Sequence, residues 1–272
     1  MGEPVRVTTL LAELRRLDPE RAPLAVFAAP ALRAPFAAAL LVHAELARAC
    51  EEAGEDMVAL VRLAWWREAL EAGRGEGHPA LALLADAVRG EPVRRALLAT
   101  LPAREALVEA RGFPTVAAYL DHARATAGRL HALLAELAGR PPALREAAFR
   151  AGAAYGAAGL LRSSRAYARR GIALVPRELL PARRTLARAG GIAVPELAEA
   201  VRRLLEAAAE AFPLPADPDP LVRLPARLAR RSRRQLARAG FDPFHRRVGP
   251  LVGGGLDLRL LLAGIRPGPG DP

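Results

Sequence analysis

The sequence predicts an all-α protein. Apolar residues recur every three or four positions along most of the chain, which is the period of a helix with one buried face. Alanine and leucine, both strong helix formers, dominate the composition, and the alternation of β-branched and polar residues that marks half-buried strands is absent. The chain has 272 residues, of which 52% are hydrophobic, so it can bury a large core and is too apolar to be disordered.

Proline and glycine divide this helical pattern into separate elements. Pro35 and Gly54 each precede one of the two clearest helices in the first third of the chain. About eight helices are predicted before residue 165, the clearest of which cover residues 36–52, 55–71, 115–137 and 143–161, and another follows near 194–212. A hinge at 213–220 leads to a last, arginine-rich helix that ends near Ala239. Without a repeat or a sharp change in composition, we expect a single domain over residues 1–265 and a disordered tail over 266–272.

The net charge of +11 suggests, at first sight, a nucleic acid or an anionic membrane as partner. All 40 basic residues are arginine, however, and arginine is abundant together with alanine, glycine and proline. A GC-rich coding sequence produces this composition without selection for a partner. We therefore expect no nucleic-acid partner, and we leave open a peripheral contact with the inner face of a membrane.

The N-terminal sequence, the short uncharged stretches and the single cysteine together favour a cytoplasmic location. Acids and arginines near the N-terminus interrupt the apolar run that a signal peptide requires, so we expect no export. The longest uncharged stretches are shorter than the roughly 20 residues of a membrane-spanning helix. The single cysteine, Cys50, fits a reducing compartment.

The first candidate site is a group of carboxylates at the end of the first long predicted helix. Glu45 and Glu52 are seven residues apart and share a helix face, and Glu51 and Glu55 are four apart. Carboxylates at these spacings can converge on Mg²⁺, which prefers oxygen ligands. A solvated, acidic helix end explains the same pattern, because runs of charge usually face water and Gly54 can end the helix before Glu55.

The second candidate site is the stretch "WWRE", which contains both tryptophans of the chain. Neighbouring helical residues point about 100° apart, so Trp65 and Trp66 cannot face the same neighbour. We expect one to pack in the core and the other, with Arg62 and Arg67, to border a cavity that has apolar and cationic walls. In the alternative interpretation both are core aromatics.

The arginine-rich helix is a third candidate. One stripe of it contains Arg223, Arg227, Arg230, Arg234 and Arg238, and leucines lie beside that stripe. A basic amphipathic helix of this kind can lie on anionic lipid headgroups. It is equally typical of an ordinary surface helix.

Four stretches, in this order, resemble the squalene and phytoene synthase family: "AALLVHAELARACEEAGEDMVALVRLAWWREALEA", "GHPALALL", "FPTVAAYLDHARATAG" and "AYGAAGLLRSSRAYARRGIALVP". The "WWRE" stretch is most similar to the branch that includes the mitochondrial complex I assembly factor and its bacterial relatives. The resemblance implies an isoprenoid synthase fold, in which an all-α bundle surrounds a central apolar cavity. Two aspartate-rich helices face each other across the cavity mouth. In active members those aspartates hold Mg²⁺, which neutralises a prenyl diphosphate and assists its departure.

The two acidic motifs of that family carry over unequally. The first reads Asp-Asp-x-x-Asp, and here it falls on Glu51, Glu52 and Glu55, so the carboxylates are retained. The second falls on residues 162–176, where serine and tyrosine occupy the two aspartate places. The motif agrees at Arg162, Arg169, Gly171 and Pro176, and it differs at Ser163, Tyr167, Ile172 and Leu174.

The loss of one acidic wall bears on the chemistry. Burying a diphosphate without matched cations costs many kcal/mol, and Mg²⁺ supplies that compensation in active members. Arginines can replace part of it, because a guanidinium group binds phosphate oxygens in bidentate fashion. We expect Glu51 and Glu55 to be the only candidate metal ligands. The expected ligand-binding residues are Glu45, Arg48, Arg62, Trp65, Trp66, Arg67, Tyr155, Arg162, Arg165 and Arg169.

Two functions remain open at this point. The preferred one is a family member that has lost transferase chemistry, needs no cofactor, and binds a prenyl diphosphate or other anionic lipid, or a protein partner in respiratory complex assembly. The alternative is an active prenyltransferase of squalene or phytoene biosynthesis, which would use Mg²⁺.

Overall fold

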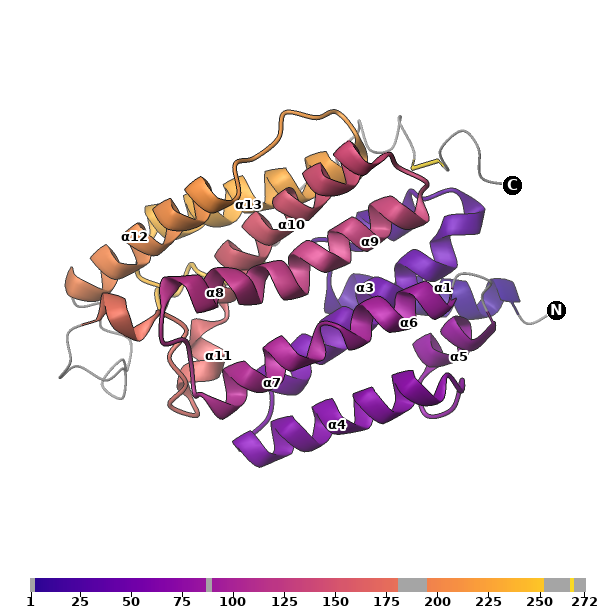
Figure 1. Cartoon of the computed structure of the whole chain (residues 1–272), viewed down its shortest axis with the longest axis horizontal. Coiled ribbons are helices and arrows are strands. Elements are labelled where there is room, and N and C mark those ends of the chain that lie inside the picture. The colour runs from indigo at the N-terminus through magenta and orange to yellow at the C-terminus, as the bar shows by residue number, and fades with distance from the viewer. Residues whose placement is uncertain (1–2, 87–89, 181–194, 252–264, 267–272) are drawn as a thin grey trace.

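The computed structural model describes residues 3–86, 90–180, 195–251 and 265–266. These residues form an all-α bundle, as the sequence predicts, and their only extended pairings are two isolated bridges, Ala28 with Ile265 and Gly112 with Ala173 (Figure 1). The helices are α1 (Glu3–Leu17), α2 (Ala22–Val26), α3 (Pro30–Glu51), α4 (Asp56–Ala72), α5 (Pro79–Asp86), α6 (Gly90–Leu98), α7 (Leu101–Glu109), α8 (Val116–Ala123), α9 (Arg129–Leu137), α10 (Pro142–Arg162), α11 (Ser164–Ala168), α12 (Pro195–Ala211) and α13 (Pro220–Arg238). A π-helical turn, η1 (Arg124–Gly128), joins α8 to α9, and a 3₁₀ turn, η2 (Arg177–Leu179), follows α11.

Helix α3 is the most deeply buried element of the first half of the chain. It packs against α1, α4 and α5, and it contains Leu40, Leu41 and Val42, which have no exposed surface. The sequence predicts its start at residue 36, after Pro35, but the helix begins at Pro30 and Pro35 lies inside it. Pro30 stands in the first turn, where a missing N–H costs little, and the buried side chains around Pro35 compensate for the single backbone hydrogen bond that it removes.

The predicted helix over residues 115–137 is one continuous rod of three parts, α8, η1 and α9 (Figure 1). The hydroxyl of Thr115 caps its start by accepting a hydrogen bond from the backbone N–H of Ala118 at 3.1 Å. Within η1, Thr126 donates to the carbonyl of His122 at 2.7 Å. Such π-helical turns occur mostly at functional sites, and this one faces the cavity described below.

Helix α10 lies at the centre of the second half of the bundle and packs against α9, η1 and α13. Small residues allow the close approach. A Cβ atom added to Gly152 would lie 2.6 Å from the ring of His131 and 2.8 Å from the carbonyl oxygen of Ala127. The close contact between α10 and the η1–α9 segment therefore requires glycine, which has no side chain, at position 152.

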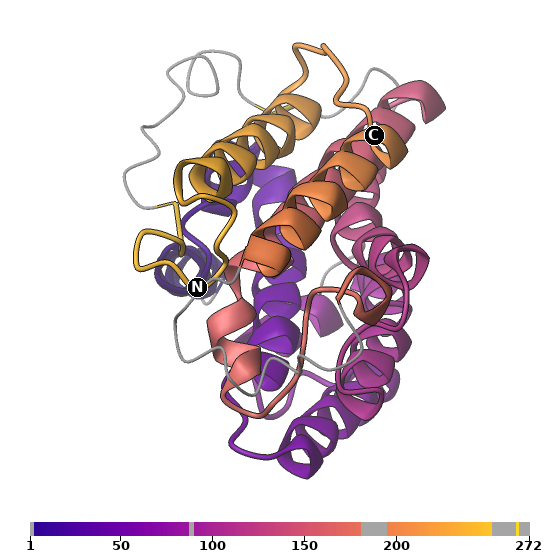
Figure 2. The same ribbon diagram turned by 90° about the vertical axis from the view of Figure 1, so that its left-hand side faces the viewer.

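Helices α12 and α13 lie on the outside of the bundle (Figure 2). The apolar face of α13, which includes Leu221, Leu228 and Leu236, is buried, and the helix packs along α10. This apolar face is thus not available for insertion into a membrane, and only the charged face remains exposed. The predicted hinge before α13 is held in place, because Asp219 caps the helix and forms an ion pair with Arg140 at 2.7 Å.

The end of the described chain is anchored to its beginning. Ile265 is completely buried, and it exchanges backbone hydrogen bonds with Phe27 and Ala29 at 3.0 and 2.7 Å. Arg266, which the sequence analysis assigns to a disordered tail, accepts a hydrogen bond from Arg140 at 2.7 Å. The tail therefore does not start at Arg266, and residues 267–272 lie outside the described residues.

A search of the described residues for a membrane-spanning helix finds none with the necessary length and hydropathy.

Candidate functional site

A cavity of about 170 Å³ lies between α3, α7, α10, α11 and the α8–η1 segment. Its lining is rich in polar groups, including Arg21, His43, Arg104, Thr126 and Arg162. The resemblance implies a deep apolar cavity, whereas this space is small and has several charged groups in its wall. Ordinary small-molecule pockets measure roughly 300–1,000 Å³, so the space admits a head group and excludes a long chain.

The places of the two acidic motifs meet at this cavity. The hydroxyl of Ser163 donates a hydrogen bond of 2.8 Å to Oε1 of Glu51. Burial raises the pKa of Glu51, although the hydrogen bond from Ser163 and the charge of Arg104 act in the opposite direction. A serine thus contacts the glutamate directly, where the family motif has an aspartate that would share a metal ion with it.

The other two acids of the first motif point elsewhere. Glu52 is exposed and accepts two hydrogen bonds from Arg48, at 3.0 and 2.8 Å, which lower its pKa. Glu55 is exposed at the position that caps the start of α4, because α3 ends at Glu51 and the chain turns through Gly54. Glu51 and Glu55 therefore do not share a helix face, in contrast to the spacing-based prediction.

These residues do not fit a magnesium cluster. In the part of the chain that the structure describes, no group of three or more His, Cys, Asp and Glu side chains is arranged to hold a metal ion. Of the motif positions, only Glu51 presents a carboxylate to the cavity, and its hydrogen bond to Ser163 occupies one of its oxygens. Mg²⁺ usually takes one or two carboxylates together with substrate oxygens in an octahedral arrangement. A single carboxylate with a raised pKa does not supply the opposed ligands that a metal cluster between two motifs requires.

The second aspartate place of the second motif is filled by a buried phenol. Tyr167 is 2% exposed, and burial raises its pKa well above the ordinary value. The guanidinium carbon of Arg170 lies 5.7 Å from the centre of its ring. Arg170 also donates to the carbonyl of Cys50 and lies 3.7 Å from Asp56, so it ties α11 to α3 and α4.

The arginines of the second motif are only partly gathered at the cavity. Arg162 lines it, whereas Arg165 and Arg169 are exposed. Arg165 donates to the carbonyl of Phe244. Arg165 and Arg169 therefore do not line this cavity, because their side chains point outward, and the binding roles predicted for them stay predictions.

Arg162 is already paired with a carboxylate that the sequence analysis did not single out. Its two terminal nitrogens donate to the two oxygens of Glu20 at 2.8 and 2.9 Å, and both side chains are 8% exposed. The hydroxyl of Tyr155 and the backbone N–H of Leu251 also donate to Glu20, each at 2.7 Å. Burial acts to raise the pKa of Glu20, but these hydrogen bonds outweigh it and the pKa is lowered. The charge of Arg162 is compensated internally.

Arg104 carries the uncompensated charge of the cavity. It is 4% exposed, and among the described residues it has no carboxylate within ion-pair distance, while its Nε atom has no hydrogen-bond partner. Its Nη2 lies 3.1 Å from Nε2 of His43, and Nδ1 of the same ring lies 3.3 Å from Arg21. Arg21 is itself paired with Asp18 at 2.6 Å.

The protonation of His43 follows from this arrangement. Burial and the two neighbouring arginines hold its pKa well below the ordinary value, so the ring is neutral. A neutral imidazole has only one acceptor nitrogen, and therefore only one of the two arginines can donate to it. The sequence signal for Arg104 is its place on the apolar face of α7, three residues after the buried Leu101 and four before the buried Val108.

Comparison with known proteins agrees with this fold and these motif places. A family model described as squalene/phytoene synthase matches residues 14–251, which include both motif regions and end after α13. The chain belongs to the squalene/phytoene synthase family. Neither a search of curated proteins nor a search of solved structures finds a match.

Most of the remaining predicted residues of this family member surround a second pocket, of about 300 Å³, on the surface between α3 and α4. Its lining is Glu45, Arg48, Ala49, Glu52, Arg62, Trp65 and Trp66. Arg48 bridges Glu45 and Glu52 at 3.2 and 2.8 Å. Arg67 does not take part, because it forms an ion pair with Glu105 at 2.7 Å.

The two tryptophans differ in burial, as predicted. Trp66 is 5% exposed and packs edge-on against His78, with ring centres 5.1 Å apart. Trp65 is 43% exposed. Trp65 borders the surface pocket together with Arg62 and does not line the central cavity.

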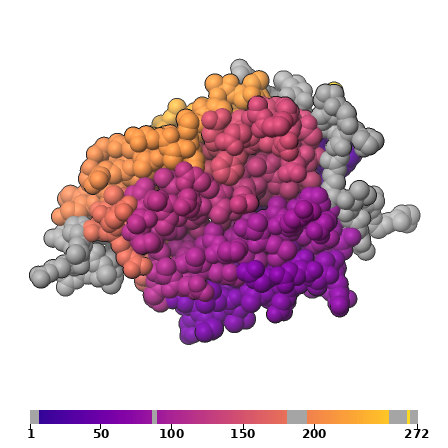
Figure 3. Space-filling view, in the orientation of Figure 1, coloured from indigo at the N-terminus to yellow at the C-terminus, as the bar shows by residue number. Residues whose placement is uncertain are grey.

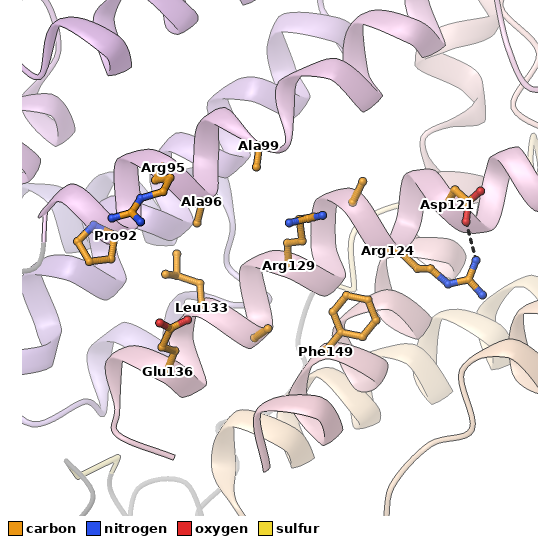
Figure 4. A pocket seen from close by; sticks show the side chains of 12 residues that line it. Pro92, Arg95, Ala96, Ala99, Asp121, Arg124, Arg129, Leu133, Glu136 and Phe149 are labelled. Carbon is orange, nitrogen blue, oxygen red and sulfur yellow. Dashed lines mark hydrogen bonds and ion pairs between the residues drawn. The ribbon is translucent and has the colours of Figure 1, made fainter. Parts of the chain in front are cut away.

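A larger groove, of about 820 Å³, lies between α6, the η1–α9 segment and α10. Figure 4 shows Pro92 and Arg95 on one side of it and Arg129, Leu133 and Phe149 on the other. None of the residues predicted from the squalene/phytoene synthase motifs lines this groove. It is open to solvent and forms part of the outer face seen in Figure 3.

Proposed function

We propose that this protein is a non-catalytic member of the squalene/phytoene synthase family that binds the phosphate of a prenyl diphosphate or another anionic lipid without a metal ion. The observation that carries the proposal is the hydrogen bond between Ser163 and Glu51. It joins the two places at which opposed carboxylates would hold Mg²⁺ in an active relative.

The charge of the cavity supports an anionic ligand. Arg21 and Arg162 are each paired with a carboxylate, and burial shifts Glu51 toward its neutral form. Arg104 remains as a buried cation without a carboxylate partner in the described residues. An unpaired buried charge is costly, so an oxyanion that accepts hydrogen bonds from this guanidinium group would be bound favourably. The cavity holds the volume of roughly five or six water molecules, which suits a phosphate or diphosphate group.

Departure of a diphosphate requires more than binding. Negative charge develops on the leaving oxygen, and preorganised cations must stabilise it in the transition state. A single arginine offers much less charge than a metal cluster. Binding without turnover is therefore the expected behaviour.

The finer assignment, to the branch of complex I assembly factors, is part of the same proposal. The "WWRE" stretch on α4 supports it. In addition, the large hydrophobic side chains that are exposed in the described residues, Met57, Val58, Val61 and Trp65, all lie on α4. An apolar face confined to one outer helix is typical of a surface that contacts another protein.

A turnover assay separates this proposal from the alternative of an active prenyltransferase. The purified protein is incubated with Mg²⁺ and farnesyl or geranylgeranyl diphosphate, and released diphosphate is measured. We expect no release above that of Glu51→Gln. Release that needs Mg²⁺ and disappears in Glu51→Gln would overturn the proposal.

Binding is measured separately, by titration with farnesyl diphosphate in EDTA and in Mg²⁺. We expect equal affinity in the two buffers and a loss of about tenfold or more in Arg104→Gln, because a charge-assisted hydrogen bond contributes about 1.5–3 kcal/mol. Thermal unfolding without ligand shows whether the variant is folded. In a deletion strain, loss of complex I activity with unchanged squalene and carotenoids would support the assembly role, and the opposite pattern would support the enzyme.

A further inference from the structure

The basic charge of the chain lies in two segments, residues 162–190, which contain eight arginines and one glutamate, and residues 220–251. Residues 220–251 contain nine arginines and one aspartate, a net charge of +8, whereas the whole chain has +11. The second of these segments covers α13 and the turn that follows it, so a large part of the basic charge lies on one element of the structure.

Six of the nine arginines of residues 220–251 line a groove of about 840 Å³ on the protein surface. Its basic lining, which we call the arginine groove, consists of Arg227, Arg230, Arg231, Arg234 and Arg238 of α13 and Arg247 of the following turn. Helical residues three, four, seven and eleven apart lie on one face, so the five arginines of α13 point the same way. Like charges at these spacings repel one another.

Five of the six arginines of the arginine groove lack internal compensation. In the described parts of the chain, no carboxylate lies within ion-pair distance of Arg230, Arg231, Arg234, Arg238 or Arg247. The aspartate of this segment, Asp242, is 8% exposed and accepts a hydrogen bond from the backbone N–H of Phe244 at 2.8 Å. The sequence that follows, residues 252–264, contains one aspartate and one arginine and so adds no net negative charge.

We propose that the arginine groove is a docking surface for an anionic lipid bilayer. Clusters of four to eight basic residues on an amphipathic helix are typical of binding to anionic headgroups. Because the apolar face of α13 is buried in the protein, the contact is electrostatic and does not insert the helix. No aromatic side chain lines the groove, and proteins that bind single-stranded nucleic acid stack bases on aromatic rings. Phosphate headgroups therefore suit this surface better than bases do.

The arginine groove is linked to the wall of the cavity through hydrogen bonds to one carboxylate. Leu251 lines the groove, and its backbone N–H donates to Glu20, which pairs with Arg162 at the cavity. Docking would thus bring the cavity wall close to the bilayer. The proposal does not depend on the identity of the cavity ligand.

The test is flotation of the full chain with vesicles of phosphatidylcholine alone and with vesicles that contain 30% phosphatidylglycerol. We expect binding only to the anionic vesicles and loss of binding in 0.5 M salt, where screening shortens the range of electrostatic attraction. In the triple variant Arg230→Gln, Arg234→Gln, Arg238→Gln, the affinity should fall about 100-fold, because each basic residue near the surface contributes about fivefold.

The matched control changes the same net charge elsewhere, with Arg16→Gln, Arg95→Gln and Arg129→Gln on α1, α6 and α9. It should bind as the parent does. Equal weakening in the two triple variants, or equal binding to neutral vesicles, would overturn the proposal. Tighter binding to RNA or duplex DNA than to anionic vesicles at the same salt concentration would assign the groove to nucleic acid instead. Thermal unfolding confirms that both variants are folded.

Discussion

At the residue scale, Ser163 stands where the family motif has an aspartate, and this difference changes the partner that Glu51 contacts. A hydroxyl group donates to a carboxylate and lowers its charge density, whereas a second carboxylate 3 Å away would repel it. The serine therefore allows the cavity to close without a cation between the two helices. This difference can be identified from the sequence because both residues lie in motifs of fixed spacing.

Ser163→Asp should restore the repulsion. Two carboxylates that share one site raise each other's pKa in the folded protein. The folded state then binds protons more strongly than the unfolded chain does, so the free energy of unfolding falls as pH rises through those raised values. We expect the variant to be about 1–3 kcal/mol less stable than the parent at pH 8 and nearly equal to it at pH 5. Urea unfolding at both pH values measures this, and the uncharged Ser163→Asn should show no such pH-dependent difference. Mg²⁺ should stabilise the aspartate variant more than the parent.

His131 is a second residue with an unusual environment. It has no exposed surface, neither ring nitrogen has a hydrogen-bond partner in the described residues, and burial lowers its pKa to about 3. A buried polar group without partners costs about 1–3 kcal/mol. His131→Leu should therefore stabilise the protein by about that amount at pH 7, as measured by urea unfolding. A lower unfolding midpoint would show that the imidazole has a partner.

Glu20 and Arg104 show what a sequence pattern does not reveal at this scale. Neither lies in a motif, and each acquires its role from residues distant in sequence, such as Arg162 and His43. Arg104 had a local signal, a charge on an apolar helix face, but that pattern does not name its partners. The charge balance of the cavity thus required the three-dimensional structure.

At the element scale, helix periodicity and proline–glycine punctuation predict most elements closely. The helix predicted over 143–161 is α10 at Pro142–Arg162, and the one predicted near 194–212 is α12 at Pro195–Ala211. Pro35 was misleading, because tertiary packing retains a proline inside α3. The π-helical turn η1 had no signal in the sequence, since its apolar spacing is that of an ordinary helix.

The fit of α10 against the η1–α9 segment gives a matched pair of substitutions. Gly152→Ala places a methyl group 2.6 Å from the ring of His131, and overpacking of this kind costs about 1–3 kcal/mol. Gly159→Ala, on the same helix, meets nothing closer than Arg162 at 3.7 Å. It should be neutral or stabilising by up to about 1 kcal/mol through higher helix propensity. Denaturant unfolding compares the two, and equal effects would contradict the close packing.

Helix α4 offers a second matched pair. Trp66→Ala removes a buried ring and should cost about 3–5 kcal/mol, whereas Trp65→Ala removes a ring that is 43% exposed and should cost less than about 1 kcal/mol. Guanidinium unfolding of the two variants measures the difference. Similar losses of stability would mean that both rings are structural and would remove Trp65 from the proposed contact surface.

At the scale of the whole molecule, buried histidines make stability depend on pH. Burial lowers the pKa of His122 to about 4 and that of His131 to about 3 from an ordinary value of 6.5. Between these values the unfolded chain binds protons that the native protein does not, so stability falls as pH drops below about 6.5. His43, whose pKa is held well below the ordinary value by burial and two arginines, is a third such group. We expect a loss of about 4–6 kcal/mol between pH 7 and pH 5. Thermal unfolding across this range should show about two thirds of the parent's slope in His131→Leu.

The overall fold was predictable because it depends on patterns that repeat along the whole chain, and the family match agrees with it. The interior was less predictable. The sequence implies a deep apolar cavity through resemblance alone, whereas its volume depends on how far α3, α7 and α10 approach one another. Likewise, the total charge of the chain does not show that much of it lies on one face of α13.

The carboxylate of Glu20 connects the two ends of the matched region. It receives one hydrogen bond from Leu251, 231 positions later in the chain, and others from Tyr155 and Arg162. During synthesis the ribosome releases the N-terminal part first, and the contact with Leu251 can form only after α13 has emerged. Until then Glu20 lacks one of its hydrogen-bond donors, so a truncated or stalled chain would leave this acid more exposed to solvent. The full set of hydrogen bonds to Glu20 therefore forms only after the segment that follows α13 has been synthesised.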